Sequence, residues 1–470
     1  MKTRWLVAAG FVVGAGIAGW LLFAPPAGKP LPPVVVAAAD TRTVPADAPE
    51  LGRAGPHAVG YRVVTLVQPG RADLLGFNPL TGNIPVRDRT LPVHLWYPAA
   101  APAGAEPMAY PVATPPTDGV DPASLPATVM VQGRAFAEAE PLRNRNFPLV
   151  VISHGFRNWP TIISTIAEHL AGHGYVVASI GHGDAETSLT VPIELAFGAV
   201  VVSRTPDQRF VIAELQRRAA DPTDPLAGLY DPSRTALMGY SMGGFGALAT
   251  MGAGYDPAGA LAQNVPGGLL TPMTEGAAEL VAGVPPQVRA MALIAPWGGG
   301  PALRSWTPSG LAAVTVPTLM VAGDLDDVSG YADGVRWLWE NMTGADRHLL
   351  VFQGARHNLP TDPLPPELAA HFAYRERYEE PVWRKDRMLA VTNHMLTAFL
   401  DTHLKGEAAK ARYLAVPTPI AADGAWPLEQ GQQAGDRTAG PDDPASAGYW
   451  PGFQRRWAVG LELHHRPPGR

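Results

Sequence analysis

Short apolar runs alternate with longer stretches of helical character over the central part of the chain. Runs that are apolar at every position predict strands covered on both faces, as in a parallel sheet. The expected strands are residues 147–152, 175–180, 235–238, 290–295, 318–322 and 349–352. The expected helices are residues 161–172, 207–220 and 335–342, with a further helix that begins at Gly244. This alternation predicts an α/β fold with a doubly wound, mostly parallel sheet, in which ligands bind at the carboxyl ends of the strands.

Two β-branched and aromatic runs precede this pattern, at residues 61–67 and 91–98. A turn-rich stretch separates them, so they predict two antiparallel strands at the N-terminal edge of the sheet. Residues 99–146 are rich in proline and alanine and show no helical period. They predict a long loop that either rims a binding site or is an insertion.

The N-terminus has the pattern of an export segment. Lys2 and Arg4 precede an uncharged apolar run over residues 5–23, which is close to the length that spans a bilayer. We therefore expect residues 1–24 to be a signal peptide or an uncleaved signal anchor. The protein would then be exported, either anchored to the inner membrane on its periplasmic side or secreted after cleavage. Residues 25–55, in which prolines are frequent, are expected to form a linker.

Composition excludes several classes of partner and site. The 470 residues carry a formal net charge of −6 and no basic run, which argues against nucleic acid as a partner. The absence of cysteine excludes disulfides, thiolate metal sites and a cysteine nucleophile. With 46% hydrophobic residues the chain can bury the core of one large domain or two smaller ones, and nothing in the composition indicates an oligomeric state.

The sequence Gly-Tyr-Ser-Met-Gly at residues 239–243 is the strongest chemical signal. It lies between an expected strand and an expected helix, so Ser241 would occupy a strained turn in which Gly239 and Gly243 let the strand and the helix approach each other. The alternative interpretation is a tight turn in front of a buried helix. A serine hydroxyl at the carboxyl edge of a sheet, beside the free amides of a helix N-terminus, is well placed to be a nucleophile.

Two later strand ends supply the partners that a serine nucleophile needs. Asp326 lies just after one expected strand and His357 just after the last one. His357 would accept the proton of the serine hydroxyl, and the Asp326 carboxylate behind the imidazole would fix its tautomer. Asp324 and Asp327 follow the same strand as Asp326. We expect Asp324 to cap the turn and Asp327 to cap a helix or to face solvent.

Two backbone amides are expected to stabilise the negative charge that develops during attack on a carbonyl group. One is the amide of Met242, and the other is that of Phe156, in the turn after the first parallel strand. The side chains of Phe156, Tyr240 and Trp297 are candidates to line the substrate pocket. Packing within the loop after its strand would explain Trp297 equally well.

The sequence implies no cofactor and no metal site. His154 is better explained as a turn histidine bonded to the backbone than as a catalytic group. His182 and Asp184 would provide only two of the ligands that a metal ion needs, so we do not expect them to hold one.

The segments that carry these residues resemble a known group of serine hydrolases. They read FPLVVISHGF, LAGHGYVVASIGHGD, GYSMGGFGAL, VPTLMVAGDLDDV and GARHN, in this order. From about residue 61 to residue 406 the chain is similar to the α/β-hydrolase superfamily, in particular to the predicted dienelactone hydrolase and platelet-activating-factor acetylhydrolase group and to cutinase-like polyester hydrolases. The resemblance implies an α/β-hydrolase fold with the triad order Ser, Asp, His. It also implies catalytic roles for Ser241, Asp326 and His357, an oxyanion hole at Phe156 and Met242, and Trp297 beside the substrate cleft.

The chain departs from these relatives in two respects. Dienelactone hydrolases use a cysteine, which this chain lacks, so their activity is not expected. The cutinase-like enzymes are shorter and contain disulfides. We expect residues 56–406 to form the hydrolase domain and residues 407–470 to form an extension that packs on it. Residues 186–203 and 252–286 are candidate caps over the nucleophile.

Together these predictions favour a serine carboxylic-ester hydrolase of the cell envelope that forms an acyl-enzyme intermediate on a small-molecule or lipid-like ester. A peptidase or an acyltransferase would use the same triad and would be distinguished by amide substrates or alcohol acceptors. An inactive hydrolase-fold protein retained for binding is the alternative from a different class. Failure to react with an organophosphate would favour that alternative.

Overall fold

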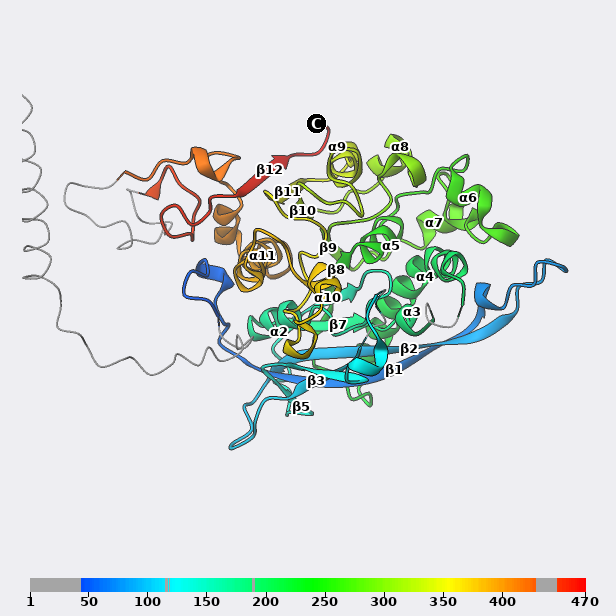
Figure 1. Cartoon of the computed structure of the whole chain (residues 1–470), viewed down its shortest axis with the longest axis horizontal. Coiled ribbons are helices and arrows are strands. Elements are labelled where there is room, and N and C mark those ends of the chain that lie inside the picture. The colour runs from blue at the N-terminus through cyan, green and yellow to red at the C-terminus, as the bar shows by residue number, and fades with distance from the viewer. Residues whose placement is uncertain (1–43, 115–116, 118, 188–190, 428–445) are drawn as a thin grey trace, which may run out of the picture. The chain divides into compact units, whose positions relative to one another are not determined.

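Parallel strands form the centre of the sheet, where the sequence has its continuous apolar runs. The computed structural model describes residues 44–114, 117, 119–187, 191–427 and 446–470. Within them, ten strands form one sheet in the order β12-β11-β10-β9-β8-β6-β7-β2-β1-β5 (Figure 1). Their bounds are β1 (Ala58–Ala72), β2 (Val86–Ala99), β5 (Ala135–Ala137), β6 (Pro148–Ser153), β7 (Val176–Ile180), β8 (Asp231–Tyr240), β9 (Val288–Ile294), β10 (Thr318–Gly323), β11 (Arg347–Phe352) and β12 (Leu461–Arg466). The strands from β11 to β7 in this order pair in parallel.

Antiparallel strands flank this parallel centre. β2 pairs with β7 and β1 pairs with β2, both antiparallel, as the two N-terminal runs predict. β12 pairs antiparallel with β11 at the opposite side of the sheet. The Pro/Ala-rich region between β2 and β6 contains a separate hairpin of β3 (Ala109–Ala113) and β4 (Thr128–Gln132).

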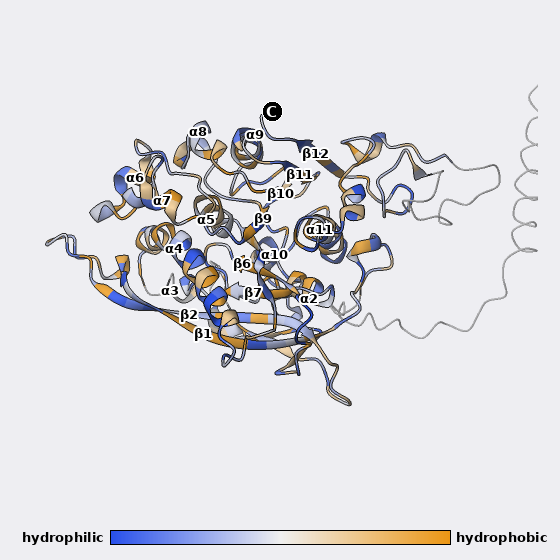
Figure 2. Cartoon of the chain, turned by 180° about the vertical axis from the view of Figure 1, so that it is seen from behind, coloured by the Kyte–Doolittle hydropathy of each residue, from blue (hydrophilic) through white to orange (hydrophobic). Residues whose placement is uncertain are grey.

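Helices cover both faces of the sheet (Figures 1 and 2). The α-helices of the described chain are α2 (Ser164–Gly172), α3 (Asp184–Thr187), α4 (Ile193–Ala220), α5 (Met242–Thr250), α6 (Ala260–Asn264), α7 (Ala278–Ala282), α8 (Pro308–Ala312), α9 (Trp337–Asn341), α10 (Phe372–Tyr378) and α11 (Lys385–Leu400). Alternate residues of β6 enter two separate cores. Val150 and Ile152 pack on the side of α2 and α11. Leu149 and Val151 pack on the side of α4 and α5, so both faces of the strand are buried.

Helix α4 is longer than the sequence predicts. The expected helix begins near Asp207, but α4 begins at Ile193 and contains Pro206 in its interior. Proline removes a backbone hydrogen bond and usually ends a helix. Here the neighbouring side chains hold the helix in place, because the buried Arg204 pairs with the buried Asp184, and the buried Asp207 pairs with the partly exposed Arg89. The first candidate cap, residues 186–203, therefore contributes the N-terminal half of this helix.

The second candidate cap, residues 252–286, packs beside α4. Its hydrogen bonds run to α4, where Arg209 donates to the Leu280 carbonyl at 2.8 Å, and to the loop before α8, where Thr307 donates to Glu275 at 2.5 Å. Within the described chain, none of its hydrogen bonds reaches Ser241. Residues 252–286 thus pack beside α4 and α5, and the Tyr255 ring stacks on that of Phe245 on α5 at 5.1 Å.

Both flanking segments of the expected hydrolase domain pack on it. The expected linker ends earlier than residue 55, because Ala48 and Leu51 are buried and the Leu51 amide donates to His394 Nδ1 on α11 at 3.1 Å. Trp450 and Phe453, in the C-terminal extension, are also buried, and this extension supplies β12. The described residues group into one compact unit.

No helix among the described residues is both apolar and long enough to cross a bilayer. The expected signal segment, residues 1–24, and its apolar run lie outside the described residues.

Candidate active site

Ser241 lies at a sharp turn between β8 and α5. Its backbone has φ 51° and ψ −114°, a strained combination for a residue with a side chain. The flanking glycines are required by space. A Cβ on Gly243 would lie 1.9 Å from the Ser153 carbonyl oxygen, and a Cβ on Gly239 would lie 2.5 Å from the Gly243 backbone. The turn therefore presents the serine side chain at the carboxyl end of the central strand.

The structure brings Ser241, His357 and Asp326 together from three separate strand ends. His357 Nε2 lies 3.0 Å from Ser241 Oγ, and His357 Nδ1 lies 2.9 Å and 3.1 Å from the two Asp326 oxygens. With a carboxylate as acceptor, Nδ1 carries the proton and Nε2 is free to accept the serine proton. All three side chains are buried, and a buried environment strengthens these hydrogen bonds.

The carboxylate of Asp326 is held ionised by its neighbours. Burial opposes ionisation, but hydrogen bonds from His357 and from the amides of Ser329 and Val328 outweigh it, so the pKa of Asp326 is below its usual value. The other two acids after β10 have different partners. Asp324 accepts the Gly354 amide at 2.6 Å, and Asp327 pairs with the Arg356 guanidinium at 2.7 Å in a largely exposed position.

The two expected oxyanion donors lie in adjoining turns. The carbonyl oxygens of Ser153 and His154 lie within 3.0 Å of the position that a Cβ on Gly243 would take, so the turn after β6 packs directly against the start of α5. Within the described chain, the amides of Phe156 and Met242 donate to no protein acceptor. Free amides at a helix start and an adjoining turn are suited to bind an anion.

Three aromatic rings form one side of the site. Phe156 lies 5.7 Å from Phe197, and Phe197 lies 5.3 Å from Trp297, each measured between ring centroids. The Trp297 amide donates to the Ser241 carbonyl at 3.1 Å, which fixes this wall next to the serine. Phe197, on the N-terminal half of α4, is a residue that the sequence did not single out. Its only signal was its position in the candidate cap 186–203.

Tyr240 differs from its expected role in lining the pocket. It is the last residue of β8, and its side chain is only 3% exposed, because it points into the core on the side of α2 and α11. Its ring lies 5.3 Å from the His357 ring. Tyr240 therefore supports the imidazole and has little surface to offer a substrate.

A second residue that the sequence missed fixes the loop of His357. Glu380 is buried after α10, and its two carboxylate oxygens accept the amides on either side of the histidine, from Arg356 at 2.5 Å and from Asn358 at 2.7 Å. Lys385 donates to the Asn358 carbonyl at 2.5 Å. Sequence gave no signal for Glu380, because it contacts only backbone groups.

His154 and His182 belong to a buried polar network under the turn of Phe156. His154 Nδ1 donates to the Gly155 carbonyl at 2.8 Å, as the sequence predicts. His182 lies 2.9 Å from both Asp207 and Ser153. Burial lowers the pKa of His154 to about 4 and that of His182 to about 3, so both rings are neutral at pH 7.

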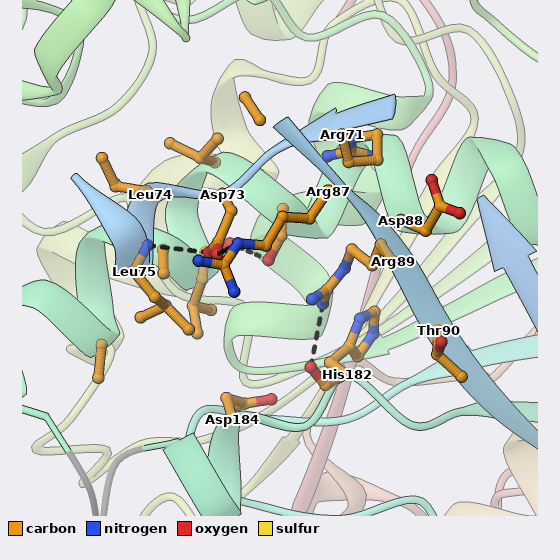
Figure 3. Close-up of a pocket in the computed structure, with 16 residues that line it drawn as sticks. Arg71, Asp73, Leu74, Leu75, Arg87, Asp88, Arg89, Thr90, His182 and Asp184 are labelled. Carbon is orange, nitrogen blue, oxygen red and sulfur yellow. Dashed lines mark hydrogen bonds and ion pairs between the residues drawn. The ribbon is translucent and has the colours of Figure 1, made fainter. Parts of the chain in front are cut away.

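Arginines complete this network. Arg89 makes two hydrogen bonds to Asp207, at 2.6 Å and 2.7 Å. It makes a third to the His182 carbonyl at 3.0 Å and lines a cavity of about 320 Å³ (Figure 3). Asp184 pairs with Arg204 and accepts the Arg157 amide at 2.8 Å. In the described part of the chain, no group of three potential metal ligands occurs. The pair His182 and Asp184 is thus occupied by protein partners, which hold the turn that carries Phe156.

Comparisons with known proteins match the central part of the chain. A family model described as platelet-activating factor acetylhydrolase, isoform II, matches residues 129–210. Cutinase 2 of Thermobifida cellulosilytica is 25% identical over 224 residues, which cover 47% of this chain and 65% of the relative. Cutinase cut1 of Thermobifida fusca is 25% identical over 224 residues, 47% of this chain and 53% of the relative. The chain thus matches less than two thirds of the length of either cutinase.

Two further similarities cover a short segment or are weak. Platelet-activating factor acetylhydrolase of Canis lupus familiaris is 47% identical over 51 residues, 11% of this chain and 12% of the relative. A ferulic acid esterase of Streptomyces cinnamoneus has a TM-score of 0.48 and 23% identity, over 74% of this chain and 91% of that chain. The family match and the strand order confirm the predicted α/β-hydrolase fold, and the sequence matches confirm the resemblance to the cutinase and acetylhydrolase group.

Proposed function

We propose that the chain is a serine carboxylic-ester hydrolase with Ser241, His357 and Asp326 as its catalytic triad. The observation that carries this proposal is the unbroken series of hydrogen bonds from the serine hydroxyl through both imidazole nitrogens to the carboxylate, at 3.0 Å and 2.9 Å. The strained backbone of Ser241 adds support, since such strain concentrates at functional sites. Similarity to cutinases and acetylhydrolases supports an ester as the bond that is cleaved.

The proposed reaction begins when His357 Nε2 accepts the Ser241 proton and Oγ attacks the ester carbonyl carbon. The oxyanion that forms accepts hydrogen bonds from the amides of Phe156 and Met242. The imidazolium, stabilised by Asp326, then donates its proton to the alcohol oxygen as the carbon–oxygen bond breaks, and an acyl-enzyme remains. Water, deprotonated by His357, attacks this acyl group, releases the acid and restores the serine hydroxyl.

The substrate class follows from the aromatic wall. Phe156, Phe197 and Trp297 offer apolar, partly exposed rings beside the nucleophile. Such rings bind an apolar acyl or alcohol group by removing its surface from water. A small-molecule or lipid-like ester with an apolar part is therefore the proposed substrate.

Export is a further part of the proposal and depends on the sequence alone. Lys2, Arg4 and the apolar run that follows support a signal peptide or anchor, and hence a protein of the cell envelope. Fractionation of cells that express the full chain, with N-terminal sequencing of the product, tests this part. An intact N-terminus in the cytoplasmic fraction would contradict it.

Hydrolysis of p-nitrophenyl esters, from acetate to long acyl chains, tests the enzymatic proposal. We expect the wild-type chain to release p-nitrophenol and to react covalently with a fluorophosphonate probe. Ser241→Ala should lose both activities. Ser233→Ala, on the exposed start of the same strand, is the matched control and should keep them.

The outcomes separate the alternatives. Equal turnover by the wild type and the Ser241→Ala variant would show that another group is the nucleophile. Absence of both turnover and probe labelling in the wild type would overturn the proposed function. The acyl-chain length with the highest kcat/KM would measure the size of the acyl site.

A further inference from the structure

A second cavity adjoins the turn that carries the expected oxyanion donor Phe156. It has a volume of about 640 Å³ and lies between β1, β2, the β3–β4 hairpin and the turns after β6 and β7. We name it the arginine pocket, after the two arginines among its lining residues. The side chains that matter for its chemistry are Tyr61, His94, Tyr110, Arg157, Trp159 and Arg377. Ser241 and His357 do not line it.

Among the side chains that the structure describes, the arginine pocket contains positive charge without a carboxylate to balance it. Among the described residues, no acidic side chain lines the pocket or lies within ion-pair distance of Arg157 or Arg377. One Arg377 nitrogen donates to the Arg157 carbonyl at 2.9 Å, while its Nε has no partner within the described chain. A largely buried guanidinium without a counterion is costly, because its charge has lost much of its hydration.

Two carboxylates that contact lining residues of the arginine pocket are already engaged. Asp184 pairs with Arg204 at 3.1 Å and accepts the amide of Arg157, not its guanidinium. Glu168 accepts the Tyr110 hydroxyl at 2.6 Å. Burial lowers the pKa of His94 to about 4, so this ring is neutral at pH 7. The positive charge of the arginine pocket at neutral pH therefore comes from its two arginines.

Aromatic rings form the walls of the arginine pocket and are fixed before any ligand enters. The Tyr61 ring lies 5.3 Å from that of Tyr110, and the Tyr61 hydroxyl is hydrogen-bonded to His94 at 2.6 Å. The Arg377 guanidinium lies 5.9 Å from the Trp159 ring centroid. Preformed aromatic walls favour a flat ligand, and the volume is in the range that holds a small organic molecule.

We propose that the arginine pocket binds a planar organic carboxylate, with its carboxylate facing Arg157 and Arg377 and its ring between the aromatic walls. A guanidinium matches a carboxylate with two parallel hydrogen bonds, and it is the group best suited to this task. Because Arg157 directly follows Phe156, the bound molecule would lie beside the oxyanion turn. This binding does not depend on the proposed ester hydrolysis.

Calorimetric titration of the full chain with naphthalene-2-carboxylate and with the neutral naphthalene-2-carboxamide tests this proposal. The two probes differ in charge and share their ring system. We expect the carboxylate to bind at least about tenfold more tightly than the amide, because one charge-assisted pair is worth more than about 1.4 kcal/mol.

Variants locate the binding. Arg157→Gln should weaken binding of the carboxylate at least about tenfold. Arg157→Lys should bind it more tightly than Arg157→Gln but less tightly than the wild type. Both replacements keep a Cβ at this residue, whose φ is 57°, so they carry the same backbone strain. Arg375→Gln is the control, because Arg375 lies exposed on the same helix as Arg377 and pairs with Glu379. The affinity of this variant for the carboxylate should equal that of the wild type.

Three outcomes would overturn the proposal. The first is equal affinity for the carboxylate and the amide. The second is an affinity that Arg157→Gln leaves unchanged. The third is purely competitive inhibition of ester hydrolysis by the carboxylate that persists in the Arg157→Gln variant. This result would show that the carboxylate binds to the amides of Phe156 and Met242. Arginine-dependent binding by a wild type without esterase turnover would instead leave this proposal standing and overturn the proposed function.

Discussion

Three acidic residues follow β10 within one turn of chain, and their partners differ. Asp326 alone contacts His357, so Asp326→Asn tests its role. The asparagine oxygen can still accept the Val328 and Ser329 amides, but its amino group would face Nδ1 and favour the wrong imidazole tautomer. We expect kcat to fall by about three to four orders of magnitude without a large loss of stability.

The matched control for that variant is Asp327→Asn, one residue away. Asp327 pairs with Arg356 on the surface, and exposed pairs of this kind contribute little. Its kcat for p-nitrophenyl acetate should stay at the wild-type level. A loss of activity in Asp327→Asn that equals the loss in Asp326→Asn would remove the assignment of Asp326 as the acid.

Glu380 is a positioning residue, since it contacts the backbone of the histidine loop and no reacting atom. Glu380→Gln keeps its size, but one of the two amides flanking His357 would then face an amino group instead of an oxygen. We expect kcat and the rate of fluorophosphonate labelling to fall about tenfold, with KM nearly unchanged, because a charge-assisted hydrogen bond is worth about 1.5–3 kcal/mol.

Glu376→Gln provides the comparison for Glu380. Glu376 is on the exposed side of α10 and pairs with the Arg356 side chain at 3.1 Å. Its kinetic constants should match the wild type. If Glu380→Gln raised KM and left the labelling rate of Ser241 intact, Glu380 would not be acting through His357.

At the residue scale, the sequence predicted the parts of the site that depend on local motifs. Ser241 stands in a recognisable turn, and Asp326 and His357 follow apolar strands in the expected order. Phe197 and Glu380 could not be found in this way. Their contributions depend on α4 and on the segment after α10 folding back over distant turns, which no local pattern specifies.

The contact between α5 and β6 makes a prediction at the scale of elements. Gly243→Ala would place a Cβ 1.9 Å from the Ser153 carbonyl, and neither backbone can move without disturbing the nucleophile turn. We expect a loss of about 3 kcal/mol or more in the free energy of unfolding, measured by urea denaturation.

Gly198→Ala is the matched control in another helix. A Cβ on Gly198, inside α4, would meet only Leu74 Cδ2, at an ordinary contact distance of 3.5 Å. Because alanine favours helix over glycine, stability should rise by about 0.5–1 kcal/mol. Equal destabilisation by the two variants would show that the close approach at Gly243 is not what requires a glycine there.

Among the elements, buried strands were predicted best and helix starts worst. A strand buried on both faces leaves a continuous apolar run, so the strands from β6 to β11 were found within a few residues of their bounds. The sequence places the start of this helix near Asp207, whereas α4 begins at Ile193 and continues through Pro206. Buried ion pairs of Arg204 and Asp207 outweigh this local preference, and they connect residues far apart in sequence.

Buried histidines determine a prediction for the whole molecule. Burial lowers the pKa to about 4 or about 3 in each of these side chains: His94, His154, His182, His348 and His394. In the unfolded chain a histidine binds a proton below pH 6.5, whereas these rings stay neutral in the folded state until about pH 4. Each of these histidines therefore lowers the free energy of unfolding by about 1.4 kcal/mol for every pH unit that the pH falls within this window.

Asp362 acts in the opposite direction. Burial raises its pKa to about 7, so its protonation favours the folded state as the pH falls from about 7 towards 4. Burial also raises the pKa of Glu168, but two opposing carboxyls do not offset five histidines. We expect the free energy of unfolding, measured in urea at pH 6.5, 5.5 and 4.5, to decrease steadily.

His394→Gln tests the origin of this decrease. A glutamine oxygen can accept the Leu51 amide in place of Nδ1 but cannot titrate. The slope of stability against pH should become shallower by about 1.4 kcal/mol per pH unit. A stability that stays constant between pH 6.5 and 4.5 in the wild type would contradict the assignment of neutral histidines.

The pairing of β12 with β11 has a consequence for the order in which the chain folds. β11 comes after the nucleophile turn and the acid loop in the sequence. In the described part of the chain, its outer edge pairs with β12, which lies far downstream. During synthesis this edge is open, with unpaired amides and carbonyls beside an apolar strand, and it is a template for pairing with another chain. Closure of the edge is a long-range event and therefore slow. The interval between synthesis of β11 and arrival of β12 is therefore when this edge is most open to pairing with another chain.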